Sequence, residues 1–280
     1  MQSQVTNGMG SFISYNNKRV LVTGCFSGMG EATARLLLSL GAEVHGLDYK
    51  DCALPLASFI SVDLRNPAAI DAAVSQLKGP FDALFNCAGV PSTFAPTDVF
   101  KVNYLGPRRL TNLLLPHIKN GGAIACIAST AGFGWLQRLP VLKDLMKTTS
   151  FEGGLEWCET HLAPRIDAYT LSKEAIILWT LQSSSTLIKR GIRMNCILPG
   201  PTETPFMAQQ TTITPGAVID VFTQPINRRS RPEEQAAALV FLNSDAASYI
   251  NGVALPVDGG FMGGITSGEL DLANLLKAAS

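Results

Sequence analysis

A tyrosine and a lysine lie four residues apart, as Tyr169 and Lys173, near the start of a helical pattern at 167–189. Residues at this spacing share one face of a helix, so the two side chains are expected to be neighbours. The pKa of a free tyrosine, about 10, is too high for a base at neutral pH, but a nearby ammonium favours the phenolate. The pair could therefore act as an acid–base group, which typically contributes about 10²–10⁴-fold to a rate.

Ser129 ends an apolar run at 123–129 and precedes this pair in the chain. Its hydroxyl could hydrogen-bond a reacting oxygen and stabilise the charge that develops there. Neither signal is specific alone. A tyrosine and a lysine at this spacing arise by chance in about one chain in five of this composition, and a serine at a strand end often caps a turn. The assignment of a catalytic role therefore depends on the order in which these residues and the motifs below follow one another along the chain.

A glycine-rich loop at 23–30, with the sequence Thr-Gly-Cys-Phe-Ser-Gly-Met-Gly, follows the first apolar run and opens the first helical pattern. Glycines allow a tight turn and leave room for a pyrophosphate at a helix N-terminus, where free N–H groups and the helix dipole favour an anion. The spacing GxxxGxG differs from the common GxGxxG fingerprint, and such a loop can also serve only as a turn. The strand before it and the helix after it favour a dinucleotide site.

Asp48 closes the second apolar run, downstream of this loop. An acidic side chain there can accept hydrogen bonds from a ribose 2′-hydroxyl and would repel a 2′-phosphate. Neither Cys25 nor Tyr49 supplies a cation for such a phosphate, although Lys50 is near. We therefore expect NAD to be preferred over NADP; the alternative is that Asp48 only caps a turn.

Short apolar runs alternate with helical patterns along most of the chain. The strands and helices that they predict would position the candidate site residues. The runs lie at 19–23, 43–48, 59–63, 82–86, 123–129, 193–198 and 252–257, and the helical patterns at 31–40, 67–77, 97–118, 167–189 and 232–243. The runs are nearly continuous in apolar residues, as expected when both faces of a sheet are covered. This alternation predicts one α/β domain, a Rossmann-like doubly wound parallel sheet of about seven strands with helices on both faces.

With these features in place, residues 18–262 resemble the short-chain dehydrogenase/reductase family. In pattern they are most similar to its 3α-hydroxysteroid dehydrogenase/carbonyl reductase branch. The motifs that carry the resemblance are TGxxxGxG at 23–30, Asp63-Leu64, Asn86-Cys-Ala-Gly89, Asn103 in Val-Asn-Tyr-Leu-Gly106, Ser129, Tyr169-Thr-Leu-Ser-Lys173, Asn195-Cys-Ile-Leu-Pro-Gly200 and Val257-Asp-Gly-Gly260. Cys87 departs from the pattern, because the family usually has an asparagine there.

The resemblance implies an enzyme that interconverts a secondary alcohol and a ketone by hydride transfer. Tyr169 would exchange the proton with the substrate oxygen, and Ser129 would position that oxygen. Lys173 would hold the nicotinamide ribose and depress the tyrosine pKa. Asn103 would anchor a water that relays the proton to solvent.

The resemblance also implies the residues of the cofactor site. No metal is expected, because the cysteines and histidines lack the spacing of metal ligands. Asp63 would meet the adenine, and Asn86 with its neighbours would line the adenosine ribose. The residues expected to bind the cofactor are Gly24, Ser27, Gly28, Met29, Gly30, Asp48, Asp63, Leu64, Asn86, Ala88, Gly89, Tyr169, Lys173, Pro199, Gly200, Thr202 and Thr204.

Five segments define the expected organisation. Residues 1–17 read as a flexible extension, 18–262 as the catalytic domain, and 263–280 as a tail over the substrate or a neighbouring subunit. Residues 130–168 form an insertion with helical content, and about 205–225 a mobile lid over the substrate. The apolar residues of the insertion could line a pocket for a bulky or cyclic substrate such as a steroid, terpenoid or aryl compound. Alternatively they form a satellite core or a subunit contact.

Composition excludes several classes of protein. The 280 residues are 46% hydrophobic and 16% charged, with 22 Lys+Arg against 22 Asp+Glu, so no charge excess points to nucleic acid or anionic lipid. No stretch approaches a membrane span, and the cysteines stand far apart, so we expect a cytoplasmic protein with reduced thiols. The partners expected are an alcohol or ketone substrate and, from the resemblance, further copies in a homodimer or homotetramer. The alternatives are an NADP-preferring carbonyl reductase and a non-catalytic nucleotide-binding regulatory protein.

Overall fold

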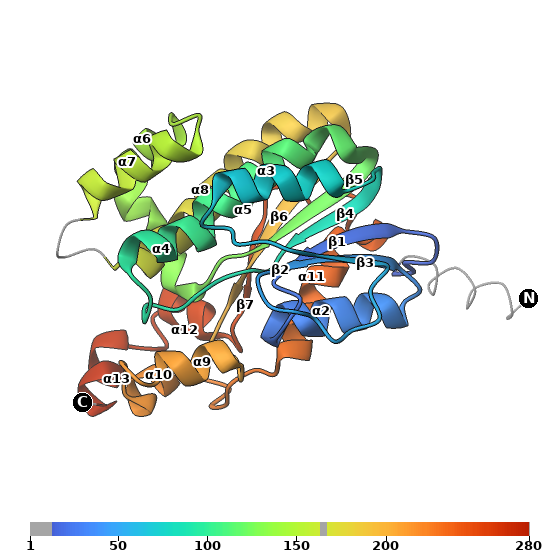
Figure 1. The fold of residues 1–280 in the computed structure, drawn as a ribbon. Coiled ribbons are helices and arrows are strands. Elements are labelled where there is room, and N and C mark those ends of the chain that lie inside the picture. The colour runs from blue at the N-terminus through green and yellow to red at the C-terminus, as the bar shows by residue number, and fades with distance from the viewer. Residues whose placement is uncertain (1–12, 163–166, 280) are drawn as a thin grey trace, which may run out of the picture.

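The structure, a computed structural model, describes residues 13–162 and 167–279. Its centre is a seven-stranded parallel sheet with strand order β3-β2-β1-β4-β5-β6-β7 (Figure 1). The strands are β1 (Arg19–Thr23), β2 (Glu43–Asp48), β3 (Ser58–Ser61), β4 (Phe81–Asn86), β5 (Ile118–Ile127), β6 (Arg193–Pro199) and β7 (Ala254–Val257). This confirms the predicted Rossmann-like α/β fold.

Helices cover both faces of the sheet (Figure 1). One face carries α2 (Gly28–Ser39) and α11 (Pro232–Asn243), which pack against each other. The other carries α3 (Pro67–Gln76), α4 (Pro96–Phe100), α5 (Gly106–Leu114) and α8 (Ala168–Leu187). Short helical segments complete the connections: η1 (Lys101–Leu105), η2 (Leu115–His117), η4 (Ile188–Arg190) and η5 (Asp245–Ala247).

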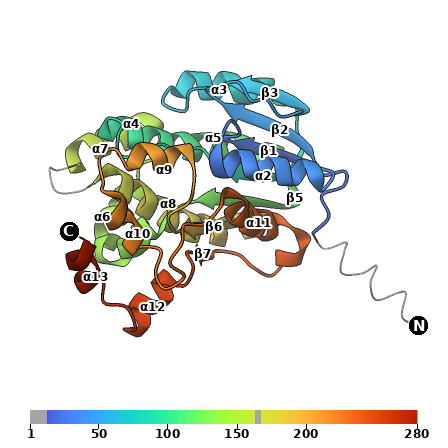
Figure 2. The ribbon, with the colours of Figure 1, turned by 90° about the horizontal axis from the view of Figure 1, so that it is seen from below.

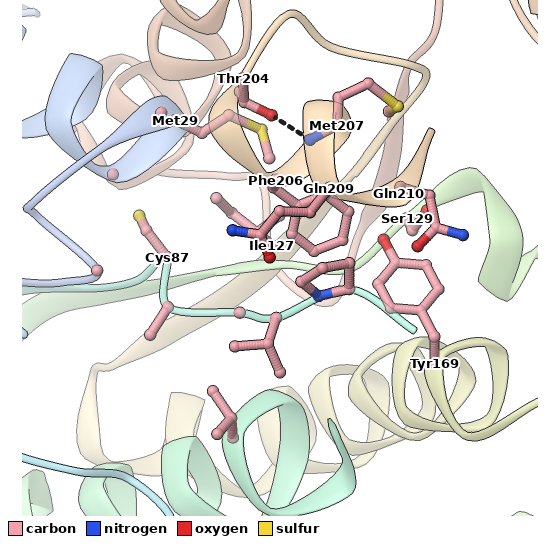
Figure 3. A pocket seen from close by; sticks show the side chains of 18 of the residues that line it. Met29, Cys87, Ile127, Ser129, Tyr169, Thr204, Phe206, Met207, Gln209 and Gln210 are labelled. Carbon is pink, nitrogen blue, oxygen red and sulfur yellow. Dashed lines mark hydrogen bonds between the residues drawn. The ribbon is translucent and has the colours of Figure 1, made fainter. Parts of the chain in front are cut away.

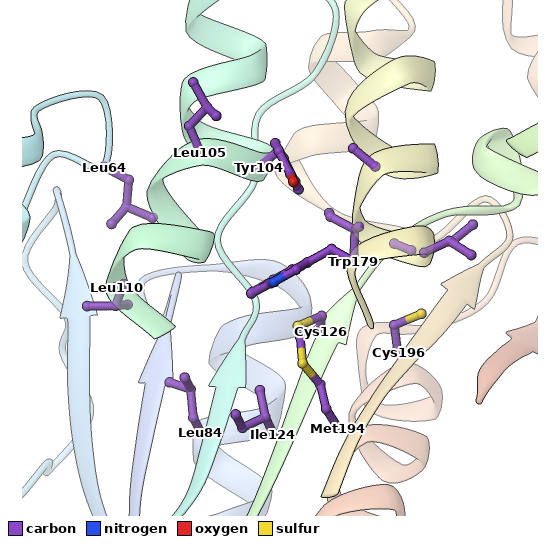
Figure 4. Packing of buried hydrophobic residues seen from close by; sticks show 14 of the residues in the cluster. Leu64, Leu84, Tyr104, Leu105, Leu110, Ile124, Cys126, Trp179, Met194 and Cys196 are labelled. Carbon is purple, nitrogen blue, oxygen red and sulfur yellow. The ribbon is translucent and has the colours of Figure 1, made fainter. Parts of the chain in front are cut away.

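Alternate residues of each strand enter two separate apolar clusters. In β5, Ile124 and Cys126 pack under α5 and α8, whereas Ala125 and Ile127 pack under α2 and α11. Figure 4 shows the first cluster, where Trp179 of α8 lies over strands β4, β5 and β6. Because both faces are buried, the strands read as continuous apolar runs in the sequence.

The strand order reverses between β1 and β4, where ligands bind in open α/β sheets. Thr23 at the end of β1 pairs in register with Asn86 at the end of β4. The Thr23 hydroxyl oxygen accepts hydrogen bonds from the backbone N–H groups of Cys87 (3.0 Å) and Ala88 (3.1 Å). This contact fixes the loop after β4 beside the glycine loop.

The segment at 130–162 contains helices, as the sequence predicts, and residues 163–166 lie outside the described residues. It forms η3 (Thr130–Arg138), α6 (Leu139–Met146) and α7 (Phe151–His161), with α6 beside α8 and α7 beside α4. Several of its large apolar side chains enter the core: Leu142 and Leu145 are fully buried, and the Trp157 ring stacks 6.3 Å from that of Phe100, whereas Phe133 and Leu136 are exposed. Only Thr130 and Ala131 of this described part line the main cavity, so the satellite core is the alternative that its packing favours.

Part of the N-terminal extension predicted at 1–17 packs on the domain. Residues 1–12 lie outside the described residues, but Tyr15 is buried against Phe85 and donates a 2.8 Å hydrogen bond to the Val240 carbonyl. At the other end, α12 (Phe261–Ser267) and α13 (Leu272–Ala279) follow β7. The lid segment 205–225 contains α9 (Pro205–Gln210) and α10 (Gly216–Val221). Among the helices of residues 13–162 and 167–279, none combines the length and hydropathy that a membrane crossing requires.

Candidate active site

A cavity of about 480 Å³ lies at the carboxyl ends of the strands and extends from the glycine loop to the lid segment (Figure 3). Of the residues predicted to be functional, all except Asn86 and Asn103 line it. Those that do are Gly24, Ser27, Gly28, Met29, Gly30, Asp48, Asp63, Leu64, Ala88, Gly89, Ser129, Tyr169, Lys173, Pro199, Gly200, Thr202 and Thr204. The chain thus brings together residues that lie up to 180 positions apart in sequence.

The glycine loop requires its glycines. Gly24 and Gly28 have positive φ angles of 72° and 61°, which residues with a side chain rarely adopt. A Cβ on Gly24 would lie 2.7 Å from the Ala88 Cα, and one on Gly30 would lie 2.0 Å from the Gly24 carbonyl oxygen. The N-cap side chain of α2, Ser27, makes no capping hydrogen bond. The loop therefore presents bare backbone and the uncapped N-terminus of α2 to the cavity, which suits a pyrophosphate.

Asp48 stands at the end of β2 beside this loop. Its carboxylate accepts hydrogen bonds from the backbone N–H of Phe26 (3.0 Å) and of Lys50 (3.1 Å). The Lys50 ammonium lies over the rings of Phe26 and Tyr49, 5.2 and 5.3 Å from their centres. This end of the cavity therefore holds both a carboxylate and a cation.

Asp63 and Leu64 also line the cavity, and they follow β3, the edge strand beside β2. The Asp63 carboxylate is paired with Arg65, whose Nη2 lies 2.6 Å from Oδ2. The hydrogen bonds from Arg65 hold the pKa of Asp63 below its usual range. Asp63 is thus a charged carboxylate locked in place by its neighbour.

Asn86 is placed differently from the sequence prediction. Its side chain points away from the cavity into the core, where Nδ2 donates to the Thr111 hydroxyl at 3.0 Å. Its Oδ1 is buried without a hydrogen-bond partner among the described residues. Because side chains alternate along a strand, the end of β4 cannot turn this amide toward a ribose. The neighbouring Ala88 and Gly89 border the cavity instead.

Ser129 and Tyr169 lie near each other on the wall of the cavity. Ser129 follows β5 and caps η3, where its hydroxyl accepts a 3.1 Å hydrogen bond from the Ala131 N–H. Tyr169 lies in the first turn of α8, whose N-cap, Asp167, accepts a 2.9 Å hydrogen bond from the Thr170 N–H. The phenol points from α8 into the cavity toward Ser129 and Gln210 (Figure 3).

Lys173 lies one helical turn beyond Tyr169 and is 3% exposed. Its ammonium donates a 2.9 Å hydrogen bond to the Ile127 carbonyl at the end of β5. The same nitrogen lies 5.5 Å from the centre of the Tyr169 ring. As predicted, the spacing of four residues brings the side chains of Tyr169 and Lys173 to one site.

Burial shifts the ionisation of both groups. It raises the pKa of Tyr169 to about 12, an effect that a hydrogen bond with Ser129 opposes and the Asp167 charge reinforces. It also lowers the pKa of Lys173 to about 8. Without further positive charge the phenol is protonated at neutral pH. A cation bound beside it would favour the phenolate.

Asn103 lies behind the cavity wall, in the π-helical segment η1. Its Oδ1 accepts a 2.8 Å hydrogen bond from the Val90 N–H, and its Nδ2 donates to the Val90 carbonyl and the Ser172 hydroxyl. A Cβ on Gly89 would lie 3.4 Å from Asn103 Oδ1 and 3.8 Å from Lys173 Nζ. Asn103 and Lys173 thus flank the same glycine. Such π-helical turns are often found at functional sites.

The segment 205–225 borders the cavity beside Tyr169. The Phe206 ring of α9 lies 5.7 Å from that of Tyr169, and the Gln210 Oε1 accepts a 3.2 Å hydrogen bond from the Ser92 N–H. Ile219 and Phe222 complete this apolar wall. The sequence predicts this segment only as the range 205–225, without naming functional residues within it. The capping threonine followed by proline at 204–205 is the signal that marks the start of α9.

Taken together, the cavity joins a loop of exposed backbone N–H groups to a half-buried phenol with a hydroxyl and an ammonium beside it. Such a site can bind a dinucleotide and exchange a proton with a substrate oxygen near Ser129.

Comparison with protein families gives two matches. The model described as short chain dehydrogenase matches residues 18–141, and the model described as Enoyl-(Acyl carrier protein) reductase matches residues 157–262.

Similar proteins of known name match over most of the chain. A coniferyl-alcohol dehydrogenase from Pseudomonas sp. is 39% identical, covering 87% of this chain and 96% of that protein. The 3-alpha-hydroxysteroid dehydrogenase/carbonyl reductase of Comamonas testosteroni is 32% identical, covering 86% and 95%. Among solved structures, a 3-alpha-hydroxysteroid dehydrogenase from Pseudomonas sp. B-0831 complexed with NADH has a TM-score of 0.76 and 30% identity, covering 90% of this chain and 100% of that one.

Proposed function

Because the chain belongs to the short-chain dehydrogenase/reductase family and is an oxidoreductase of the alcohol dehydrogenase type, we propose that it uses NAD to interconvert a bulky secondary alcohol and its ketone. The observation that supports this most strongly is the meeting of Tyr169, Lys173 and Ser129 at one end of a cavity whose other end is the glycine loop. The name of one similar protein, a 3-alpha-hydroxysteroid dehydrogenase/carbonyl reductase, supports a bulky secondary alcohol as the substrate class.

The cavity fits a dinucleotide. The backbone of 24–30 and the N-terminus of α2 would hold the pyrophosphate, since side chains at Gly24 and Gly30 would collide with the backbone of Ala88 and Gly24 and distort this loop. Asp48 would accept the hydrogen bonds of the adenosine ribose, and 199–204 would border the nicotinamide. When bound, the nicotinamide supplies the hydride acceptor for oxidation or the hydride for reduction.

The protein's own groups move the proton. In oxidation, Tyr169 as phenolate takes the proton of the substrate hydroxyl while the carbon gives up its hydride. Ser129 donates a hydrogen bond to the same oxygen and holds it in place. In reduction, the phenol returns the proton to the carbonyl oxygen.

The positive charge of Lys173 favours the phenolate in the buried site. Asn103 supports the route by which the proton reaches solvent, since it flanks Gly89 together with Lys173. A water bound at this glycine would connect the two side chains. The lid segment excludes bulk water from the reacting atoms.

Primary aryl alcohols are a second candidate substrate class, favoured by the 39% identity with a coniferyl-alcohol dehydrogenase. The wall of Phe206, Ile219 and Phe222 would suit either an aromatic ring or an alicyclic one. The reaction is the same, except that the product is an aldehyde.

A screen of both classes with both cofactors tests the proposal. We expect turnover of bulky cyclic or aryl alcohols, with a higher kcat/KM for NAD than for NADP. Higher kcat/KM with NADP, or turnover confined to small sugars or acyl thioesters, would contradict it.

The Asp48→Asn variant tests the cofactor assignment itself. Removing the charge should reduce the preference for NAD over NADP by about tenfold, because the repulsion of a 2′-phosphate is lost. Asp51→Asn, which changes an exposed acid outside the cavity, is the matched control and should keep the wild-type preference.

We also propose a cytoplasmic homo-oligomer. The six cysteines, all of them free, support a reducing environment. The molar mass of the purified protein in solution tests the oligomeric state, and a mass near 30 kDa would contradict it.

A further inference from the structure

The C-terminal helix α13 has an apolar face that is half-buried. The half-buried residues are Leu272, Leu275, Leu276 and Ala279, at the spacing of one helical stripe. The remaining described residues of α13 are exposed. The helix therefore packs on a neighbour through this stripe.

That neighbour is α10 of the lid segment, which α13 contacts. Figures 1 and 2 both show the two helices side by side, far from the glycine loop. Leu272 packs with the same apolar cluster that Phe222 joins after α10. The tail thus covers the outer side of the lid.

A tight turn fixes the direction of α13. Gly268 ends α12 with a φ of 81°, and the Leu270 N–H donates a 3.0 Å hydrogen bond back to the Gly264 carbonyl. The Leu270 side chain lies on Gly264, where a Cβ would approach its Cδ1 to 2.6 Å. Since α12 is anchored by the buried Phe261 and Met262, α13 is attached to the body of the domain.

The inner side of α10 faces the cavity. Ile219 and Phe222 line it, and the Phe222 ring lies 5.2 Å from that of Phe261. α10 is therefore placed between the cavity and α13. Loss of the contact between α10 and α13 would leave the side chains of Ile219 and Phe222 free to move away from a bound substrate.

We propose that α13 is a positioning element for substrate binding: it holds α10 so that Ile219 and Phe222 form a fixed wall of the substrate site. The nature of that substrate rests on the proposed function, but the mechanical role does not. The glycine loop and Asp48 lie at the other end of the cavity, so cofactor binding is independent of α13.

The variant Leu272→Asp tests this role, with Ala273→Asp as the matched control on the exposed face of the same turn. We expect Leu272→Asp to raise KM for the alcohol about tenfold and to speed amide hydrogen exchange in 216–222. The dissociation constant for NADH should stay within about twofold of wild type. Ala273→Asp should behave like wild type in all three measurements.

Deletion of 269–280 is the second variant and should give the same changes if Leu272→Asp does not fold. Unchanged KM or unchanged exchange in 216–222 would overturn the proposal, and so would a change confined to oligomeric mass, which would assign α13 to a contact between subunits. If no alcohol is turned over, the proposed function fails, while hydrogen exchange still decides whether α13 holds α10.

Discussion

The ammonium of Lys173 lies 5.5 Å from the centre of the Tyr169 ring and is fixed there by a 2.9 Å hydrogen bond to the Ile127 carbonyl. Ile127 ends β5, and Ser129 follows two residues later. The end of β5 thus places Ser129 directly, and its Ile127 carbonyl holds the ammonium of Lys173. The phenol comes from α8, so the packing of α8 on the sheet sets the geometry of all three groups.

The charge of Lys173 should be visible in the pH dependence of catalysis. Oxidation needs the phenolate, so kcat/KM for the alcohol should fall as the pH falls through the apparent pKa of Tyr169. Reduction needs the phenol, so kcat/KM for the ketone should fall as the pH rises. Lys173→Met should move both profiles to higher pH by at least about one unit. Lys143→Met, on the exposed face of α6, should leave them in place, and a Lys173→Met profile equal to wild type would refute this role.

The same variant should stabilise the folded protein at neutral pH. The lowering of the Lys173 pKa from 10.5 to about 8 means that folding works against this charge, by up to about 3 kcal/mol. Below pH 8 lysine is charged in both states and the cost is complete; between pH 8 and 10.5 the folded state loses its proton first, so wild-type stability rises. Urea unfolding should show a gain for Lys173→Met that is largest below pH 8 and shrinks toward pH 10.5. A variant less stable than wild type at pH 7 would contradict this.

Gly30→Ala should abolish NADH binding, because its methyl group would lie 2.0 Å from the Gly24 carbonyl oxygen and displace the loop. The matched control is Gly263→Ala in α12, where no atom lies within 4 Å of the added carbon. Fluorescence titration with NADH should separate the two variants by at least about 100-fold in dissociation constant. Equal affinities would exclude the loop as the pyrophosphate site.

Gln210→Ala should loosen the lid segment, since it removes the 3.2 Å hydrogen bond from the Ser92 N–H that joins α9 to the loop after β4. One such bond contributes about 1 kcal/mol, so we expect KM for the alcohol to rise about fivefold with little change in NADH affinity. Gln76→Ala, on the exposed face of α3, is the control. A KM equal to that of the control would show that this bond is not used during turnover.

The sheet could be predicted from the sequence because its strands are buried on both faces and their apolar runs are unbroken. The predicted bounds of the first two strands coincide with β1 and β2, whereas β5 begins at Ile118, five residues earlier than predicted. Its extra residues include Gly121 and Gly122, which carry no hydrophobic signal. Polar and glycine-rich extensions of a strand form through pairing with neighbours, which a single run does not reveal.

Within the candidate site, spacing predicts the pairing of Tyr169 with Lys173, since a helix turn is a local property. The direction of Asn86 depends on strand alternation and on a partner in α5, and the position of Asn103 depends on a π-helical turn. The role of the insertion does not follow from its composition, because tryptophan and leucine suit a pocket and a core equally. The packing of Trp157 on Phe100 and the burial of Leu142 and Leu145 separate the two, and both are tertiary properties.

The most direct test of the proposed mechanism is the variant Tyr169→Phe, compared with Tyr249→Phe at a fully exposed tyrosine. We expect Tyr169→Phe to bind NADH within about twofold of wild type and to lose at least about 100-fold in kcat/KM, whereas Tyr249→Phe should match wild type in both. Retention of turnover within tenfold of wild type by Tyr169→Phe would contradict the assignment of the phenol as the group that exchanges the substrate proton.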